Sequence, residues 1–211
     1  VNVVMGAGYY VNATHPADID VFTEEELSDQ ITREITTGVG NSGIKAGIIG
    51  EIGCTWPLTP NEKKILRASA NAQQKSGASI LIHPGRNHNA PIEILDILTE
   101  SGVDISRVIM GHIDRTISSI KELREIAKTG CILEWDLFGD EVSYYGLSNF
   151  DMPNDVQRMD LIQNIIKDGM VDQIVVSQDI CTKHRLVNYG GHGYGYILKH
   201  ILPRMRSRGF K

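Results

Sequence analysis

Short runs rich in isoleucine and valine alternate with longer stretches of helical periodicity along the whole chain. Six such runs occur, at residues 1–8, 45–53, 79–85, 107–114, 131–139 and 172–180. Stretches that space their apolar residues as a helix does lie between them, at residues 23–38, 59–77, 89–102, 118–130 and 154–169. Apolar strands that alternate with helices predict an α/β fold, in which a parallel sheet is covered by helices.

The composition indicates a globular protein without a nucleic-acid or membrane partner. The 211 residues are 41% hydrophobic, and we expect residues 1–211 to form a single domain. The net charge is −5, and the one basic cluster, at 199–211, has the pattern of an amphipathic helix. No apolar run reaches the roughly 18 residues of a membrane span.

The cysteines bear on the compartment of the protein. The three cysteines form no CxxC pair, and the first residues lack the basic start of a secretory signal. Free thiols of this kind are typical of reducing compartments, so we expect a cytoplasmic protein. We expect its partner to be a small-molecule substrate, and we leave a homodimer open.

Polar residues capable of binding a metal end four of the apolar runs. They are Glu51, His83, His112 and Asp179, each beside a glycine or at the entry to a loop. The period of the repeat fits a doubly wound sheet or a (β/α)8 barrel, but in a barrel all these ends converge on one face.

The prediction of a metal site rests on these four residues together and not on any one of them. A single histidine after a strand is more often a structural residue than a ligand. Together, histidines and carboxylates without a thiolate suit Zn²⁺, Mn²⁺, Fe²⁺ or Co²⁺. We therefore predict a metal site at the carboxyl ends of the strands.

Four segments carry a family resemblance. "GIIGEIG", "ILIHPG", "VIMGHIDR" and "VVSQDIC", in this order and spacing, resemble the phosphotriesterase-related branch of the phosphotriesterase family, in the amidohydrolase superfamily. The resemblance implies a (β/α)8 TIM barrel with its helices outside, of which this chain holds strands three to eight and lacks the first two βα units.

The resemblance also implies a hydrolase with two divalent transition-metal ions, for which we expect zinc. Glu51 matches the bridging carboxylate, while His83 and His112 match the ligands of the more exposed metal. Asp179 matches a ligand of the buried metal that also takes the proton of the bridging water. The family's first-strand His-x-His pair is absent from these residues, which indicates an N-terminally truncated chain. We expect Gly50 and the glycine at 53 to keep space open around Glu51.

The substrate prediction depends on two further positions. Arg115 and Leu137 stand where phosphotriesterase carries the Asp and His that assist proton transfer, so the resemblance favours small amides such as N-acetylated amino acids or taurine. Arg115 could bind an anionic group, or it could pair with Asp114 or Asp136. A phosphotriesterase- or lactonase-type ester hydrolase and a non-catalytic truncated binding form remain as alternatives.

Aromatic residues and the remaining histidines have less specific positions. Tyr10 and Trp135 fall near strand ends, where they either shape a substrate pocket or pack within the barrel. The glycine-rich segment 190–196 follows no strand directly and is predicted to be a loop over the site. For five further histidines we expect surface or supporting roles, and these are His15, His88, His184, His192 and His200.

Overall fold

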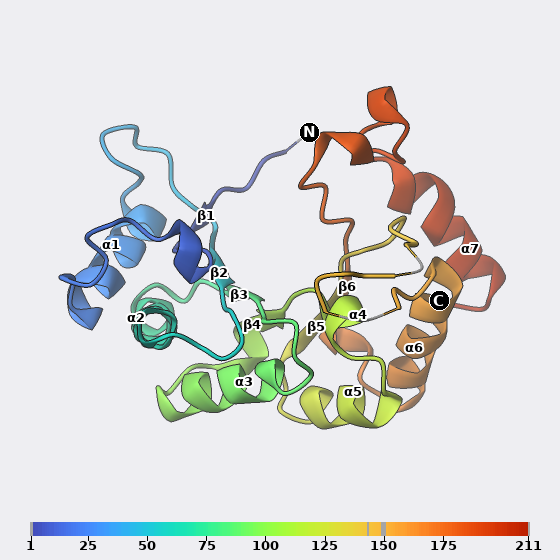
Figure 1. The fold of residues 1–211 in the computed structure, drawn as a ribbon, viewed down its shortest axis with the longest axis horizontal. Helices are drawn as coiled ribbons and strands as arrows, with labels where there is room; N and C mark the ends of the chain where they lie inside the picture. Colours follow the sequence, from blue (N-terminus) through green and yellow to red (C-terminus); the bar gives the residue numbers. More distant parts are fainter. Residues whose placement is uncertain (1, 143, 149–150, 211) are drawn as a thin grey trace. The chain divides into compact units, whose positions relative to one another are not determined.

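A computed structural model describes residues 2–142, 144–148 and 151–210. Residues 1 and 211, at the ends of the predicted first strand and tail helix, lie outside this range. The strands follow the chain in order, β1 to β6, in a parallel sheet (Figure 1). The predicted order of strands and helices is confirmed. The chain forms two compact units, Val1–Gly111 with Lys128–Ile132, and His112–Ala127 with Leu133–Lys211.

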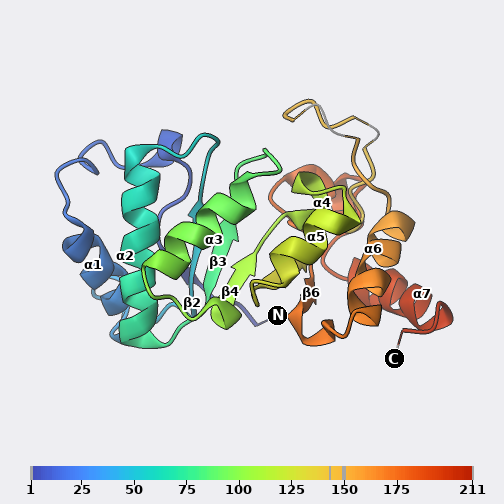
Figure 2. The same cartoon turned by 90° about the horizontal axis from the view of Figure 1, so that it is seen from below.

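The first unit holds four parallel strands with three helices beside them (Figure 2). The strands are β1 (Gly6–Ala7), β2 (Ile48–Gly53), β3 (Ile80–His83) and β4 (Val108–Met110). The helices are α1 (Glu24–Thr36), α2 (Pro60–Ser76) and α3 (Ala90–Glu100), with 3-10 turns η1 (Asn12–Thr14) and η2 (Ile105–Arg107). Their buried faces contribute the core side chains, which include Leu27, Ile31, Ile49, Ile52, Leu66, Ile80, Ile82 and Leu98.

Capping residues explain where two of these helices begin. Thr23 and Glu26 form a capping box at the start of α1, as the sequence predicts, and Thr59 and Glu62 form another at the start of α2. Each box satisfies two backbone N–H groups that have no partner within the helix. Helix α2 ends at Gly77, whose φ of 73° favours glycine.

Glu62 does more than cap its helix. Its side chain is fully buried and accepts hydrogen bonds from the backbone N of Asn12 at 3.1 Å and of Thr55 at 3.0 Å. The hydroxyl of Thr55 and the backbone N of Thr59 also donate to it, both at 2.8 Å. The carboxylate therefore ties the segments that follow β1 and β2 to the start of α2.

In the second unit, strand β5 (Ile132–Trp135) pairs in parallel with strand β6 (Ile174–Val176). The first residue of β5, Ile132, belongs to the first unit. Its helices are α4 (Ile113–Thr116), α5 (Ile120–Ala127), α6 (Asp155–Lys167) and α7 (Leu202–Ser207), the last preceded by a π-helical turn, η6 (Ile197–Ile201). Three 3-10 turns complete it, namely η3 (Val171–Gln173), η4 (Lys183–Arg185) and η5 (Val187–Tyr189). Buried side chains from these elements include Leu123, Ile126, Leu133, Trp135, Met159 and Ile162.

Several apolar runs predict more strand than the structure contains. Of the described residues of the run 1–8, only Gly6–Ala7 form a strand, and the run 172–180 contributes Ile174–Val176 after a 3-10 turn. In the run 107–114 the strand stops at Met110, because His112, with a φ of 51°, is the N-cap of the short helix α4. Among the described helices, none combines the length and the apolar character needed to cross a membrane.

Candidate metal centre

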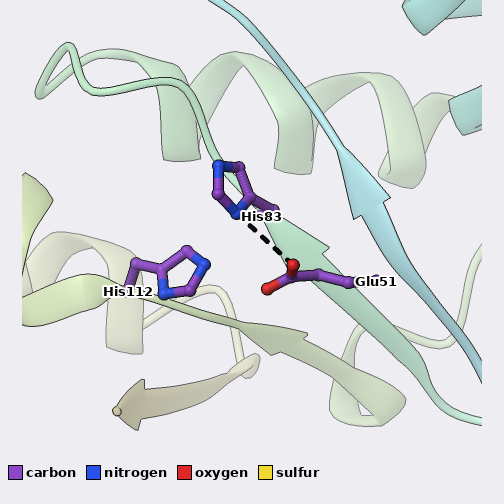
Figure 3. Close-up of side chains that lie close together, drawn as sticks. All are labelled: Glu51, His83 and His112. Carbon is purple, nitrogen blue, oxygen red and sulfur yellow. Dashed lines mark ion pairs between the residues drawn. The ribbon is translucent and has the colours of Figure 1, made fainter. Parts of the chain in front are cut away.

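Glu51 and His83 face each other on neighbouring strands of the first unit. Oε2 of Glu51 lies 3.4 Å from Nδ1 of His83, and the two side chains are 31% and 8% exposed (Figure 3). Strand β2 pairs with β3 so that Ile52 lies opposite Ile82. A register irregularity between Ile49 and Ile52 includes Glu51, so the strand pairing itself sets the direction of this carboxylate.

The two glycines near Glu51, Gly50 and Gly53, are needed for a reason that differs from the predicted one. A Cβ at Gly50 would lie 2.4 Å from the carbonyl O of Leu81, and φ at Gly50 is 133°. A Cβ at Gly53 would lie 2.2 Å from the backbone N of Val11. Both glycines therefore permit close approach of backbone segments, and the expectation that they keep open space is not supported.

Tyr10 lies against the imidazole of His83. Its hydroxyl is 3.1 Å from Nδ1 and 3.2 Å from Nε2, and the ring centroids are 4.7 Å apart in an edge arrangement. Tyr10 is 40% exposed, so it combines contact with a candidate ligand and access to solvent. This position is consistent with the predicted role of Tyr10 in a pocket, which stays a prediction.

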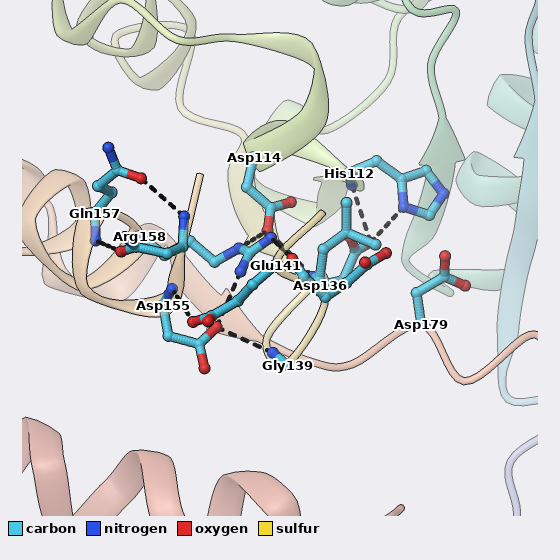
Figure 4. Close-up of polar contacts among 12 residues, drawn as sticks. His112, Asp114, Asp136, Gly139, Glu141, Asp155, Gln157, Arg158 and Asp179 are labelled. Atoms are coloured by element: carbon cyan, nitrogen blue, oxygen red, sulfur yellow. Dashed lines mark hydrogen bonds and ion pairs between the residues drawn. The ribbon is translucent and has the colours of Figure 1, made fainter. Parts of the chain in front are cut away.

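His112 in the second unit is held by a carboxylate that the sequence analysis considered only as a partner of Arg115. Oδ2 of Asp136 accepts a hydrogen bond from the backbone N of His112 at 2.9 Å and lies 2.8 Å from Nδ1 of its ring (Figure 4). Both side chains are buried. A carboxylate beside a ring nitrogen helps to orient a histidine ring.

Asp179 follows strand β6 and also has an unusual backbone, with φ of 39°. Nη1 of Arg185 donates to its carbonyl O and lies 3.5 Å from Oδ2 of its carboxylate. The side chain of Asp179 is 29% exposed. Non-glycine residues with positive φ cost conformational energy and occur preferentially at functional sites, and both His112 and Asp179 share this property.

Arg115 and Trp135 are buried, at 3% and 0% exposure. Nη1 of Arg115 lies 3.4 Å from the hydroxyl of its neighbour Thr116. Asp114, one of the two partners considered for Arg115, forms an ion pair with Arg158 at 2.7 Å. Burial and the nearby charge of Asp136 raise the pKa of Asp114 to about 6, against the opposing effect of Arg158.

Two residues beside His112, Asp136 and Arg158, were not predicted from the sequence as part of this site. Asp136 follows β5 just as the predicted ligands follow their strands, so its strand-end position was a usable signal. Arg158 lies inside helix α6, where an arginine is normally a surface residue, and nothing in the sequence pattern marks it as buried.

Two of the further histidines, His15 and His192, lie against tyrosine residues. Nε2 of His15 lies 2.8 Å from the carbonyl O of Tyr10, and the ring of His192 stacks on Tyr196 at 4.1 Å between centroids. His192 also lines a cavity of about 340 Å³ within the second unit, together with Phe138, Asp140, Gln178, His184 and Arg185. The segment 190–196 therefore forms part of a cavity wall beside the segment that carries Asp179.

A family assignment follows from comparison with known proteins. The family model for the phosphotriesterase family matches residues 1–211, which is the whole chain. The chain belongs to the phosphotriesterase family. It is 55% identical over 211 residues to an N-acetyltaurine hydrolase of Dictyostelium discoideum and 50% identical over 210 residues to one of Mus musculus. The matches cover 100% and 99% of this chain but 57% and 60% of those proteins.

Solved structures of this type confirm the fold. A resiniferatoxin-binding protein from Rhodobacter sphaeroides matches with a TM-score of 0.92 and 31% identity, over 99% of this chain and 58% of that one. A phosphotriesterase homology protein from Escherichia coli, solved with phosphate in its active site, matches with a TM-score of 0.86 and 30% identity, over 100% and 69%. The predicted barrel-type α/β fold of the phosphotriesterase family is thus confirmed.

Proposed function

We propose that this chain carries part of the active site of a metal-dependent hydrolase that cleaves the amide bond of a small N-acyl compound, with N-acetyltaurine as the first candidate. The Glu51–His83 pair is the observation that carries the proposal, since it joins a carboxylate and an imidazole from neighbouring strands. The names of the N-acetyltaurine hydrolases supply the substrate class.

The chemistry of the side chains fits a metal ion. Glu51, His83 and His112 can each offer one ligand atom. The family resemblance supplies the expectation that His83 and His112 bind the same ion. Imidazole and carboxylate together suit zinc and similar transition metals.

The second ion of the family's pair would be held by Glu51, as the bridge, and by Asp179. No His-x-His pair occurs in these 211 residues to complete its ligand set. We also propose zinc as the metal and the cytoplasm as the compartment, as the sequence leads us to expect. A homodimer stays an open prediction.

The metal pair, when bound, lowers the pKa of a bound water and polarises the carbonyl oxygen of the substrate. Asp179 then accepts the proton of the attacking water and returns it to the nitrogen of the departing amine, so that the proton balance of the hydrolysis closes. Tyr10 would exclude water beside His83, and Trp135 would support the ligand segment from the core. Arg115 would provide a cation for the acidic end of the substrate.

A substrate panel tests this function. The protein at its natural length is loaded with Zn²⁺ and assayed with N-acetyltaurine, a simple lactone and a neutral phosphotriester. We expect release of taurine at the highest kcat/KM, loss of activity with a chelator and recovery with added Zn²⁺. Full activity in a metal-free sample, or a preference for the phosphotriester, would contradict the proposal.

A further inference from the structure

A fully buried arginine lies behind the turn that carries His112 (Figure 4). Arg158 donates from Nε to Oδ2 of Asp114 at 2.7 Å and from Nη1 to Oδ1 of Asp155 at 2.9 Å. Its Nη2 donates to the carbonyl O of Asp140 at 2.7 Å. Buried ion pairs lose much of their attraction to desolvation, and packed hydrophobic side chains often stabilise a core equally well. Stability alone is therefore a weak explanation for this arginine.

One arm of the Arg158 network leads to the candidate ligand His112. Oδ2 of Asp114 also accepts a hydrogen bond from the backbone N of Leu137 at 3.1 Å. Asp136, the residue before Leu137, binds the backbone N of His112 in return. The side chain of Asp114 in α4 thus binds the backbone after β5, and the side chain of Asp136 after β5 binds the backbone at the start of α4. This reciprocal pair of contacts fixes the backbone that carries His112.

Asp114 depends on Arg158 for its charge balance. The other carboxylate oxygen of Asp114, Oδ1, is buried and has no hydrogen-bond partner among the described residues. Within the described part of the chain, Arg158 is also its one ion-pair partner. Loss of the guanidinium would leave the buried Asp114 carboxylate with backbone donors and no cation, so its contact with the segment after β5 would be weakened.

The other arm leads to the cavity of the second unit. Oδ1 of Asp155 accepts a hydrogen bond from the backbone N of Gly139 at 3.0 Å, and Oδ2 accepts one from the hydroxyl of Tyr196 at 2.7 Å. Burial and this carboxylate raise the pKa of Tyr196 to about 12, so its hydroxyl remains a donor. Tyr196 stacks on His192, and both Gly139 and His192 line the cavity.

We propose that Arg158 is a positioning residue that sets the orientation of His112 and the shape of the cavity wall at the same time. The inference rests on the proposed function, because it treats His112 as a metal ligand, and it adds that the cavity holds part of the substrate. The two arms meet at the guanidinium, so a change at Arg158 is expected to alter metal binding and substrate binding together. A change at Tyr196 alters the cavity arm alone.

Arg158→Lys tests the inference in the protein at its natural length. Lysine keeps the positive charge, but its single ammonium cannot reach three acceptors that lie on different segments. We expect a normal circular dichroism spectrum, at least a tenfold lower affinity for Zn²⁺ by competition titration and a shifted absorption spectrum with Co²⁺. We also expect a raised KM for N-acetyltaurine. The matched control is Arg124→Lys, at an exposed ion pair with Asp168. Its Zn²⁺ affinity and its KM for N-acetyltaurine should stay within twofold of the parent values.

Parental Zn²⁺ affinity and a parental Co²⁺ spectrum in folded Arg158→Lys would overturn the inference while leaving the hydrolase proposal intact. A parent protein that binds no metal would overturn both. If Arg158→Lys does not fold, Tyr196→Phe decides. We expect this variant to raise KM at parental Zn²⁺ affinity, and a parental KM or a loss of metal would overturn the two-arm arrangement.

Discussion

Asp136 holds His112 at two points, through a 2.9 Å hydrogen bond from the backbone N and a 2.8 Å contact with Nδ1 of the ring. The double contact stabilises the left-handed backbone of His112, with φ of 51°, and fixes its ring in one orientation. If His112 binds a metal, as we propose, part of the affinity depends on the carboxylate beside its ring.

Asp136→Asn should therefore weaken Zn²⁺ binding by roughly 10- to 100-fold, because the amide keeps the shape of the side chain but loses its charge. Competition titration with a chelator measures the affinity. Asp172→Asn, at an exposed position before β6, is the matched control and should bind Zn²⁺ as the parent does. An unchanged affinity in Asp136→Asn would remove Asp136 from the metal site.

Glu62→Ala should lower the free energy of unfolding by about 3 kcal/mol, since it leaves several backbone N–H groups of buried or capped segments without their charged acceptor. Urea unfolding followed by circular dichroism measures the change. Glu100→Ala, on the exposed end of α3, should change stability by less than about 0.5 kcal/mol. Equal stability of the two variants would show that the Glu62 contacts contribute little.

The sequence predicted the order of the elements well, because hydrophobic periodicity and helix caps are local signals. The capping box at Thr23 and Glu26 is an example, as both partners lie within one turn of each other. Strand ends were less well predicted at 107–114, since the apolar run continues through Ile113 although the backbone turns at His112. Apolar character reports burial and does not report where a strand stops.

The candidate site was predictable where chemistry and position coincide and not where function depends on tertiary contacts. Glu51 and His83 were selected as metal-binding residue types at strand ends, and the structure pairs them. Arg158 was not selected, because its role depends on Asp114 and Asp155 and one of these lies 44 residues away in the chain. Burial of a charged residue within a helix follows from packing that no local pattern records.

The three thiols should differ in their reaction with an alkylating reagent at pH 7.5. Burial raises the pKa of Cys54, and it raises that of Cys131 to about 11, so both stay protonated at this pH. Cys181 is exposed and should be modified first, although burial of part of its side chain raises its pKa as well. Peptide mass spectrometry measures the order of labelling. Rapid modification of Cys54 in the folded protein would contradict the packing of the first unit.

Arg115→Ala should raise KM for N-acetyltaurine by more than tenfold, because a guanidinium that binds an anionic group contributes mainly to substrate binding. KM for an uncharged N-acetyl amine of similar size should change far less. Arg115→Lys is the matched variant and should recover part of the loss. Equal losses for the charged and the uncharged substrate would assign Arg115 to the structure of the site instead of to substrate recognition.

Asp179→Asn should reduce kcat by roughly 10²- to 10⁴-fold, because asparagine cannot accept the proton of the attacking water. Steady-state assays of taurine release measure the effect, with Asp172→Asn as the control that should keep parental turnover. Since Asp179 is also a proposed ligand, metal content is measured in the same samples and the assay is repeated with excess Zn²⁺. A variant that stays inactive when fully loaded supports Asp179 as the base. Recovery of normal turnover on loading would leave Asp179 a ligand only, and another group would have to carry the proton.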